Sequence, residues 1–450
     1  MARIGVLEQM RLFSFIRDWA KGDRALVPSA LRLVLVILLG SSFSYGYTVL
    51  THEAIIDSVW DDSLQKLLLK RFPDATLEQL DQAHAYAYGG SILQDMGYYP
   101  FSTRLFSDLT HYVRSGDFIT ALIRESQDLN GYAFALGALE HYAADTEGHR
   151  IATNRAVPML YPELRRKFGD DVTYWDNPVA HVRTEFGFDV LQVISGRYAP
   201  DKYRSFIGFQ VSRDVMERAF LDTYDIEMKD VFGNVTLAIG SYRYSIKSIV
   251  PGMTKVAWSL KQDQLKKEIP GITRKTFLYN LSRSSFEREW GTEYKKPGFG
   301  TKILAFFFRW LPGRGPFSSL KIRTPSPEVE KLFMASFNAT IDRYKAMLAN
   351  VDAGGSGLPD ENLDAGGATI AGKYKGTDEA YAKLLGRLAD RQFAGMQPDL
   401  RENVLAYYKD LKPSPPAKST KKEKAEFTKL VNQLDRLKAV PEAVAAPPVP

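Results

Sequence analysis

The spacing of apolar residues along the chain predicts a helical protein. Between residues 47 and 200, apolar side chains recur at intervals of three and four, with few strand-like alternations, which is typical of helices that bury one face. Residues 201–350 form a second, mostly helical stretch that is interrupted by four Pro-Gly pairs, which end helices. We therefore predict an all-α fold, with a multi-helix domain at 47–200 and a mostly helical extension at 201–350.

The C-terminal part has a different composition. Glycines between residues 351 and 367 predict a flexible linker, and the apolar pattern returns in a helical segment at 368–411. Residues 412–450 are rich in Lys, Pro and Ala, which is typical of a mobile tail. Within this tail the pattern predicts one amphipathic helix near 420–438.

Residues 1–46 have the features of an export signal. Basic residues precede a short apolar run at 33–40, and Ser44 and Gly46 are the small residues that a signal peptidase reads. The run is shorter than the ~20 residues that cross a membrane. We favour a signal peptide cleaved after Gly46, with an uncleaved membrane anchor through residues 30–46 as the alternative. Either interpretation places the body of the protein outside the cytoplasm.

Composition narrows the possible chemistry. The 450 residues include 59 Lys and Arg against 53 Asp and Glu, for a net charge of +6. Residues 1–46 contain six basic and three acidic residues, and residues 412–450 contain eight basic and four acidic residues. The body of the chain, residues 47–411, contains 45 basic and 46 acidic residues. The nearly neutral body gives no support to a polyanion-binding protein. A hydrophobic content of 45% excludes wholesale disorder, and the absence of Cys limits any metal site to His, Asp and Glu.

The histidines are clustered and have acidic companions at helical spacing. All six lie between His52 and His181. On a helix, residues four apart share a face, so His141, Asp145 and His149 form one stripe about 12 Å long. His181 and Glu185 repeat the spacing of four, which lets two side chains bind one ion.

Either of these pairs alone would more simply be a helix-stabilising pair, but together they favour a metal site. Upstream, Asp95 ends a helix before a Gly/Pro turn, and His111 lies on the next short helix. These two residues would complete the site around His141. We interpret His84 as a structural residue. The alternative is that it supports a metal ligand or contacts the substrate.

These residues resemble the zinc-dependent phospholipase C family, which is all-helical and holds three zinc ions in one cleft. The matching positions are Thr51 and His52, residues 94–100 and 107–111, His141-x-x-x-Asp145, His149, and residues 180–185. The resemblance covers residues 47–195 and implies that 47–200 is a phospholipase C-like catalytic domain. The single-strand-specific zinc nucleases share this architecture.

The resemblance also implies the ligands of each ion. The first zinc would be held by Asp95, His111, His141 and Asp145. The second would be held by His149, His181 and Glu185. The third would be held by the amino nitrogen and carbonyl of Tyr47, where the family usually has Trp, together with His52 and Asp145. By the same resemblance, a metal-bridging hydroxide attacks the phosphorus, and Asp95 is the catalytic residue that orients or deprotonates it.

We therefore expect an exported zinc-dependent phosphodiesterase with two to three Zn²⁺ ions that hydrolyses phospholipid head-group esters. A zinc-dependent single-strand nuclease is the alternative, although the neutral body lacks the basic groove that nucleic acid demands. A non-catalytic exported zinc-binding helical protein is the second alternative, but three protein ligands at the second zinc leave an open position.

Beyond a phospholipid or other phosphodiester substrate, the sequence identifies no specific protein partner. The aromatic run at 302–311 would suit a membrane surface, with burial in the core as the alternative.

Overall fold

The computed structural model describes residues 49–99, 101–194, 209–244, 246, 262–263, 266–267, 323, 325–355, 357–412, 414–415 and 419–440. Contacts divide the chain into two units, Met1–Ser42 and Phe43–Pro450, and every described residue lies in the second. The predicted export signal at 1–46, Tyr47 and the aromatic run at 302–311 lie outside the described residues.

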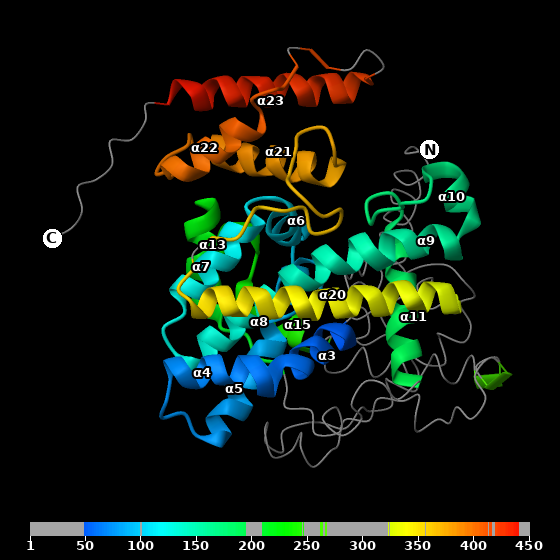
Figure 1. The fold of residues 1–450 in the computed structure, drawn as a ribbon. Helices are drawn as coiled ribbons and strands as arrows, with labels where there is room; N and C mark the ends of the chain where they lie inside the picture. Colours follow the sequence, from blue (N-terminus) through cyan, green and yellow to red (C-terminus); the bar gives the residue numbers. More distant parts are fainter. Residues whose placement is uncertain are drawn as a thin grey trace, which may run out of the picture. The chain divides into compact units, whose positions relative to one another are not determined.

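The described residues form helices joined by turns (Figure 1). The helices are α3 Val49–Val59, η1 Trp60–Leu64, α4 Gln65–Arg71, α5 Leu77–Gly90, η2 Gln94–Tyr98, α6 Arg104–Tyr112, α7 Ser115–Glu125, α8 Leu129–Glu147, η3 Gly148–Thr153, α9 Asn154–Leu160, α10 Pro162–Phe168, α11 Pro178–Ile194, α13 Arg213–Tyr224, α14 Met228–Val231, α15 Val235–Tyr244, α20 Pro327–Asp352, α21 Lys375–Asp390, α22 Pro398–Tyr407 and α23 Lys421–Ala439. Within this part of the chain, the only β-type pairing is an isolated bridge between Glu361 and Ala368. The all-α prediction is confirmed.

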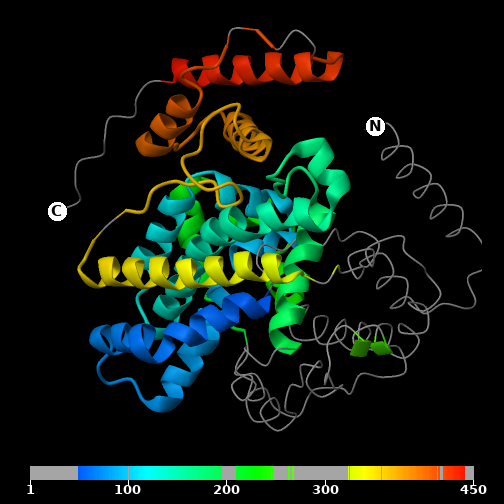
Figure 2. The ribbon, with the colours of Figure 1, turned by 45° about the vertical axis from the view of Figure 1, so that its right-hand side comes forward.

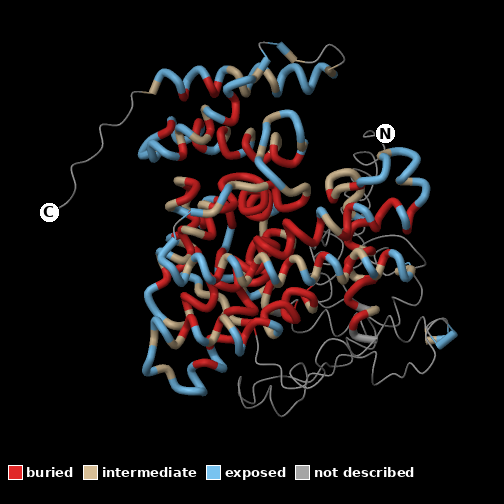
Figure 3. The backbone as a smooth tube through the Cα atoms, viewed as in Figure 1, coloured by how far each residue is buried: buried red, intermediate tan, exposed pale blue. Residues whose placement is uncertain are grey.

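Helix α8 is the centre of the core. Asp128 caps its first turn by accepting a hydrogen bond from the Gly131 amide, and every residue from Gly131 to Glu147 is buried. A helix that is surrounded on all sides must be covered by several others. Figure 3 shows the buried residues concentrated along these inner helices, whereas α23 is largely exposed.

Helices α5 and α8 approach each other closely because glycines occupy the crossing. A Cβ atom on Gly137 would lie 2.1 Å from the Ala87 carbonyl oxygen, and one on Gly90 would lie 2.0 Å from that of Phe134. No side chain fits at either position without moving the backbone. The crossing brings the turn that follows α5, and with it η2, against the C-terminal half of α8, where the Gln94 side chain donates to the Ala138 carbonyl at 3.0 Å.

The described part of the 201–350 extension packs on the N-terminal helices. Helix α20 begins with Ser326 as its cap and buries a stripe at helical spacing, and it runs across α8 in both views (Figures 1 and 2). The Tyr344 hydroxyl donates to the Leu136 carbonyl at 2.8 Å. Phe220 of α13 stacks on Phe106 of α6 with ring centroids 5.4 Å apart. These contacts form one hydrophobic core across both segments.

The C-terminal helices pack beside α6 and on one another. Lys383 of α21 lies 2.8 Å from Asp108 of α6, and Arg436 of α23 donates to the Ala389 carbonyl at 2.9 Å. The amphipathic helix near 420–438 is present as α23, which buries Leu434 and Leu437. Among the described helices, none is long and apolar enough to cross a membrane.

Replacing Gly137 by Ala tests the close crossing of α5 and α8. Alanine normally favours a helix over glycine by about 1 kcal/mol, but here its methyl group meets backbone. We expect Gly137→Ala to lower the free energy of unfolding by roughly 1–3 kcal/mol, the usual cost of overpacking. The measurement is chemical denaturation followed by circular dichroism.

Gly240→Ala is the matched control, because a Cβ at this exposed position of α15 meets no atom within 4 Å. It should raise stability slightly. If both variants are stabilised, the close approach of α5 and α8 is not a packing constraint.

Candidate metal centre

The first group of candidate ligands comes from three helices that meet at α8. Asp95 lies in η2, His111 near the end of α6, and His141 and Asp145 one turn apart on α8. The His111 Nε2 atom lies 3.5 Å from Asp95 Oδ1 and 3.3 Å from Asp145 Oδ2. His141 Nε2 lies 3.2 Å from Asp145 Oδ2 and 3.4 Å from His111 Nε2. The four residues that the sequence assigns to the first zinc are therefore brought together.

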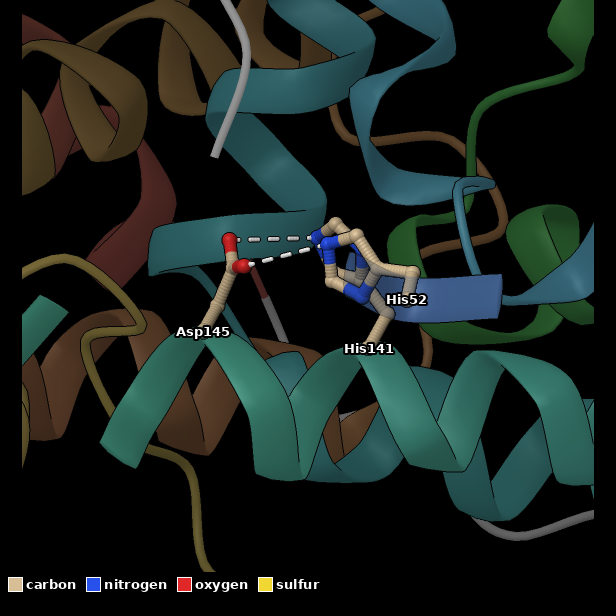
Figure 4. A group of neighbouring side chains, drawn as sticks. All are labelled: His52, His141 and Asp145. Carbon is tan, nitrogen blue, oxygen red and sulfur yellow. Dashed lines mark ion pairs between the residues drawn. The ribbon is translucent and has the colours of Figure 1, made fainter. Parts of the chain in front are cut away.

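His52 of α3 approaches the same carboxylate from its other oxygen. Its Nε2 atom lies 3.7 Å from Asp145 Oδ1, and its ring stacks on His141 with centroids 4.7 Å apart. Figure 4 shows Asp145 facing both histidines. The two oxygens of Asp145 thus point toward different partners, as a carboxylate shared by two ions would. Tyr47, the other expected ligand of the third zinc, lies outside the described residues.

The second group forms where α8 ends. His149 lies in η3, a π-type turn in which the Asn154 amide donates to the His149 carbonyl five residues back. Such turns widen a helix and are frequent at functional sites. His149 Nε2 lies 3.4 Å from Glu185 Oε1, and His181 Nδ1 lies 2.9 Å from the same oxygen. The pair on α11 and His149 therefore converge, and they are the three residues that the resemblance assigns to the second zinc.

In each of the five histidines, the ring nitrogen that faces away from the other candidate ligands contacts an oxygen atom of the protein. The partners are the Ser107 carbonyl for His111 at 2.8 Å, the Ser91 carbonyl for His141 at 2.9 Å, the Glu140 carboxylate for His52 at 3.0 Å, the Asn154 side-chain oxygen for His181 at 2.8 Å, and the Leu363 carbonyl and Asp364 carboxylate for His149, both at 3.2 Å. This arrangement fixes the orientation of each ring, as is usual for histidines that bind metals.

The donor atoms in both groups fit a zinc ion. Both Asp145 oxygens, His149 Nε2, His181 Nδ1 and both Glu185 oxygens make no hydrogen bond of standard geometry within the described part of the chain. They nevertheless lie in closely spaced sets whose members are all within 4.8 Å of one another. Buried polar atoms need partners. A cation bound within each group would be the partner of the ligand atoms of that group. Imidazole nitrogen and carboxylate oxygen are ligands that zinc prefers.

Burial and mutual charge determine the protonation of the site. The eight described residues of the expected site are at most 2% exposed. Burial would raise the pKa of Asp145, but His141 and His149 hold that pKa well below its usual value. Burial lowers the pKa of His111, whereas Asp145 and Asp95 raise it to about 10. Burial keeps the pKa of Glu185 above its usual value, although His181 and His149 lower it. A cation bound beside these carboxyl groups would lower their pKa values and favour their charged forms.

Sequence reasoning missed three residues that hold the candidate ligands. Glu140 holds His52, Asn154 holds His181, and Asp364 holds His149. Glu140 and Asn154 are polar residues on helices, and their spacing in the sequence from His52 and His181 forms no recognisable pattern. Asp364 comes from the segment assigned to a Gly-rich linker. No local pattern in the sequence distinguishes any of these residues.

His84 takes no part in either group. Its Nε2 atom lies 3.0 Å from Asp57 Oδ1, and its ring stacks on Trp60 with centroids 3.7 Å apart. Tyr88 donates to the same Asp57 oxygen at 2.5 Å. This cluster between α3 and α5 is separate from the candidate ligands.

The comparison with family models agrees with the geometry. Residues 51–234 match the model described as zinc dependent phospholipase C, and this segment contains every residue of the candidate groups. No curated protein and no solved structure matches the chain significantly. The resemblance drawn from the ligand spacing is confirmed, and the helical architecture is that of the family. The similarity of this chain to the zinc-dependent phospholipase C family therefore extends over residues 51–234.

Proposed function

We propose that this protein is an exported zinc-dependent phosphodiesterase that hydrolyses head-group esters of phospholipids. The observation that carries this proposal is the convergence of five buried histidines with three carboxylates, Asp95, Asp145 and Glu185, inside the segment that matches the family. A structural zinc site needs one closed set of four ligands. Two adjoining sets joined near Asp145 exceed that need and suit a multinuclear hydrolytic centre.

In this proposal each group holds one ion. Asp95, His111, His141 and Asp145 hold the first zinc, and His149, His181 and Glu185 hold the second. His52 and Asp145 hold the third together with the α-amine and carbonyl of Tyr47. Tyr47 precedes His52 by only a few positions in the sequence, so an amine created by cleavage after Gly46 would be close in sequence to His52.

In the proposed reaction, Asp145 and Asp95 have different roles. Zinc ions bound here would neutralise the charge of a phosphodiester and lower the pKa of a water molecule toward neutrality. Asp145 faces His52 with one oxygen and His111 and His141 with the other, and thereby sets the spacing of the ligands. We assign Asp95, beside His111, the role of orienting the attacking water and accepting its proton.

Aromatic side chains mark the side from which we infer that the substrate approaches. Tyr98 is partly exposed, and its ring lies 6.2 Å from those of both His111 and Tyr174. Tyr174 in turn meets His181 edge-on at 5.8 Å. Arg104, which pairs with Asp108 at 3.2 Å, places its guanidinium over the ring of Trp175 at 5.1 Å on the same side. A phosphodiester that enters past Tyr98 would meet both groups.

Substitution of the shared carboxylate tests the multinuclear site. Asp145→Asn should reduce kcat/KM about a thousandfold, or ~4 kcal/mol in transition-state stabilisation, because it disturbs the ligands of two ions. Metal analysis should give at least two zinc ions per wild-type chain and fewer in the variant. Asp62→Asn, at an exposed position of η1, is the control and should match the wild type. One zinc or none in the wild type, or near-normal turnover by Asp145→Asn, would contradict the proposal.

A direct comparison of substrates tests the assigned reaction. The zinc-loaded protein should release the phosphorylated head group from phosphatidylcholine vesicles and leave single-stranded DNA intact, because the body of the chain lacks a net positive charge. Chelation should abolish the lipid activity, and added zinc should restore it. Cleavage of DNA without lipid hydrolysis would assign a nuclease. Turnover of neither substrate would support the non-catalytic alternative.

The start of the mature chain tests both export and the third ion. Protein recovered from outside the cytoplasm of an expressing bacterium should begin at Tyr47, because cleavage after Gly46 creates the amine that the third zinc requires. N-terminal sequencing and intact mass give the answer. A leader that remains attached would support the membrane anchor at residues 30–46 and remove the third site from the proposal.

A further inference from the structure

Residues 359–364 lie outside the family-matched segment, yet most of them form hydrogen bonds with helices of that segment. The Tyr142 hydroxyl donates to the Pro359 carbonyl at 2.7 Å. The Asp360 carboxylate accepts hydrogen bonds from the Gly116 and Asp117 amides at 3.0 and 3.2 Å. The Leu363 amide donates to the carbonyl of His111 at 3.1 Å. We call these six residues the 359–364 segment.

The 359–364 segment ends with a buried carboxylate at the second group. Asp364 is 3% exposed. Its Oδ2 atom accepts hydrogen bonds from the hydroxyls of Tyr112 and Tyr374 at 2.5 and 2.6 Å. Its Oδ1 atom lies 3.2 Å from His149 Nδ1. The two tyrosines therefore fix the carboxylate, and the carboxylate faces the ring nitrogen of His149 that points away from Glu185.

The same segment also contacts the second histidine of the group. The Asn154 side chain donates to the backbone carbonyl of Asp364 at 2.8 Å, and its oxygen lies 2.8 Å from His181 Nε2. Because that oxygen can only accept, His181 Nε2 carries the proton and Nδ1 is left to face Glu185. Both imidazoles of the second group thus take their orientation from contacts that lead to residue 364.

We propose that Asp364 is a positioning residue for the second zinc site, so that the chain beyond the family-matched segment sets the affinity of that site. This inference rests on the proposed function, in which His149, His181 and Glu185 hold one ion. A carboxylate on the outer nitrogen keeps that nitrogen protonated, leaves Nε2 as the ligand atom and makes it a stronger donor. His111 and His141 face backbone carbonyls in this position, whereas His149 faces the Asp364 carboxylate in addition to the Leu363 carbonyl. Loss of Asp364 should therefore affect the second site alone.

The experiment compares zinc binding by the full chain and by Asp364→Asn. Asparagine keeps the size of the side chain but removes its charge. Competition with a chromophoric chelator should show one ion bound 10- to 100-fold more weakly, the usual effect of removing such a partner, with the remaining zinc affinity unchanged. In Co²⁺-loaded protein, the visible absorption of the second site should change, whereas a purely structural defect would alter every site.

Asp360→Asn is the matched control, because it makes the same chemical change in the same segment and Asp360 bonds to the amides of α7 instead of to a histidine. It should bind zinc as the wild type does. Equal affinities in Asp364→Asn and wild type would overturn the positioning role and leave the proposed function intact. Fewer than two zinc ions in the wild type would instead overturn the proposed function.

A second variant covers the case in which Asp364→Asn does not fold. Tyr374→Phe keeps the carboxylate and removes one of the two hydroxyls that fix it. Its second site should bind zinc severalfold more weakly, with an unchanged circular dichroism spectrum. A folded Tyr374→Phe protein with wild-type zinc affinity at every site would also overturn the proposal.

Discussion

Several carboxylates and imidazoles are buried together at one point in the core, and the surrounding helices must compensate for the loss of their contact with water. Asp95, Asp145 and Glu185 lie among five histidines, and none of these eight residues is more than 2% exposed. Removing such groups from water is costly unless their charges are compensated. Hydrogen bonds from the outer ring nitrogens supply part of the compensation. Cations at the inner atoms would supply the rest, which is the physical basis of the proposed zinc centre.

The helical packing serves to bring these groups together. The glycine crossing of α5 and α8 places the Ser91 carbonyl 2.9 Å from His141 Nδ1. The turn that follows carries Asp95 to His111, and the Gly97 amide fixes this turn by donating to the Ser107 hydroxyl at 3.0 Å. The widening of the helix at η3 then carries His149 toward α11. Two of the segments that depart from a regular α-helix, η2 and η3, thus each contain a candidate ligand, Asp95 and His149.

The sequence predicted those features that depend on local spacing. Apolar periodicity gave the helical class, and the spacing of four on α8 and α11 paired His141 with Asp145 and His181 with Glu185. The grouping of Asp95 and His111 with that pair was first suggested by their places at a helix end and on the next short helix, and the resemblance to the family implied it as well. Asp364 was beyond the reach of either argument, because its contact with His149 joins residues far apart in the chain. Glycines around it predicted a linker, whereas the 359–364 segment makes hydrogen bonds to α6, α7 and α8.

Anomalous X-ray scattering at the zinc edge, from crystals of the full protein purified without added metal, would locate bound zinc ions directly. If the proposed zinc centre exists, separate peaks should appear within the two groups, one between His111, His141 and Asp145 and one between His149, His181 and Glu185. A third peak between His52 and Asp145 is expected if the mature chain begins at Tyr47. The absence of any peak among these residues, or a single zinc bound elsewhere, would contradict the proposed zinc centre.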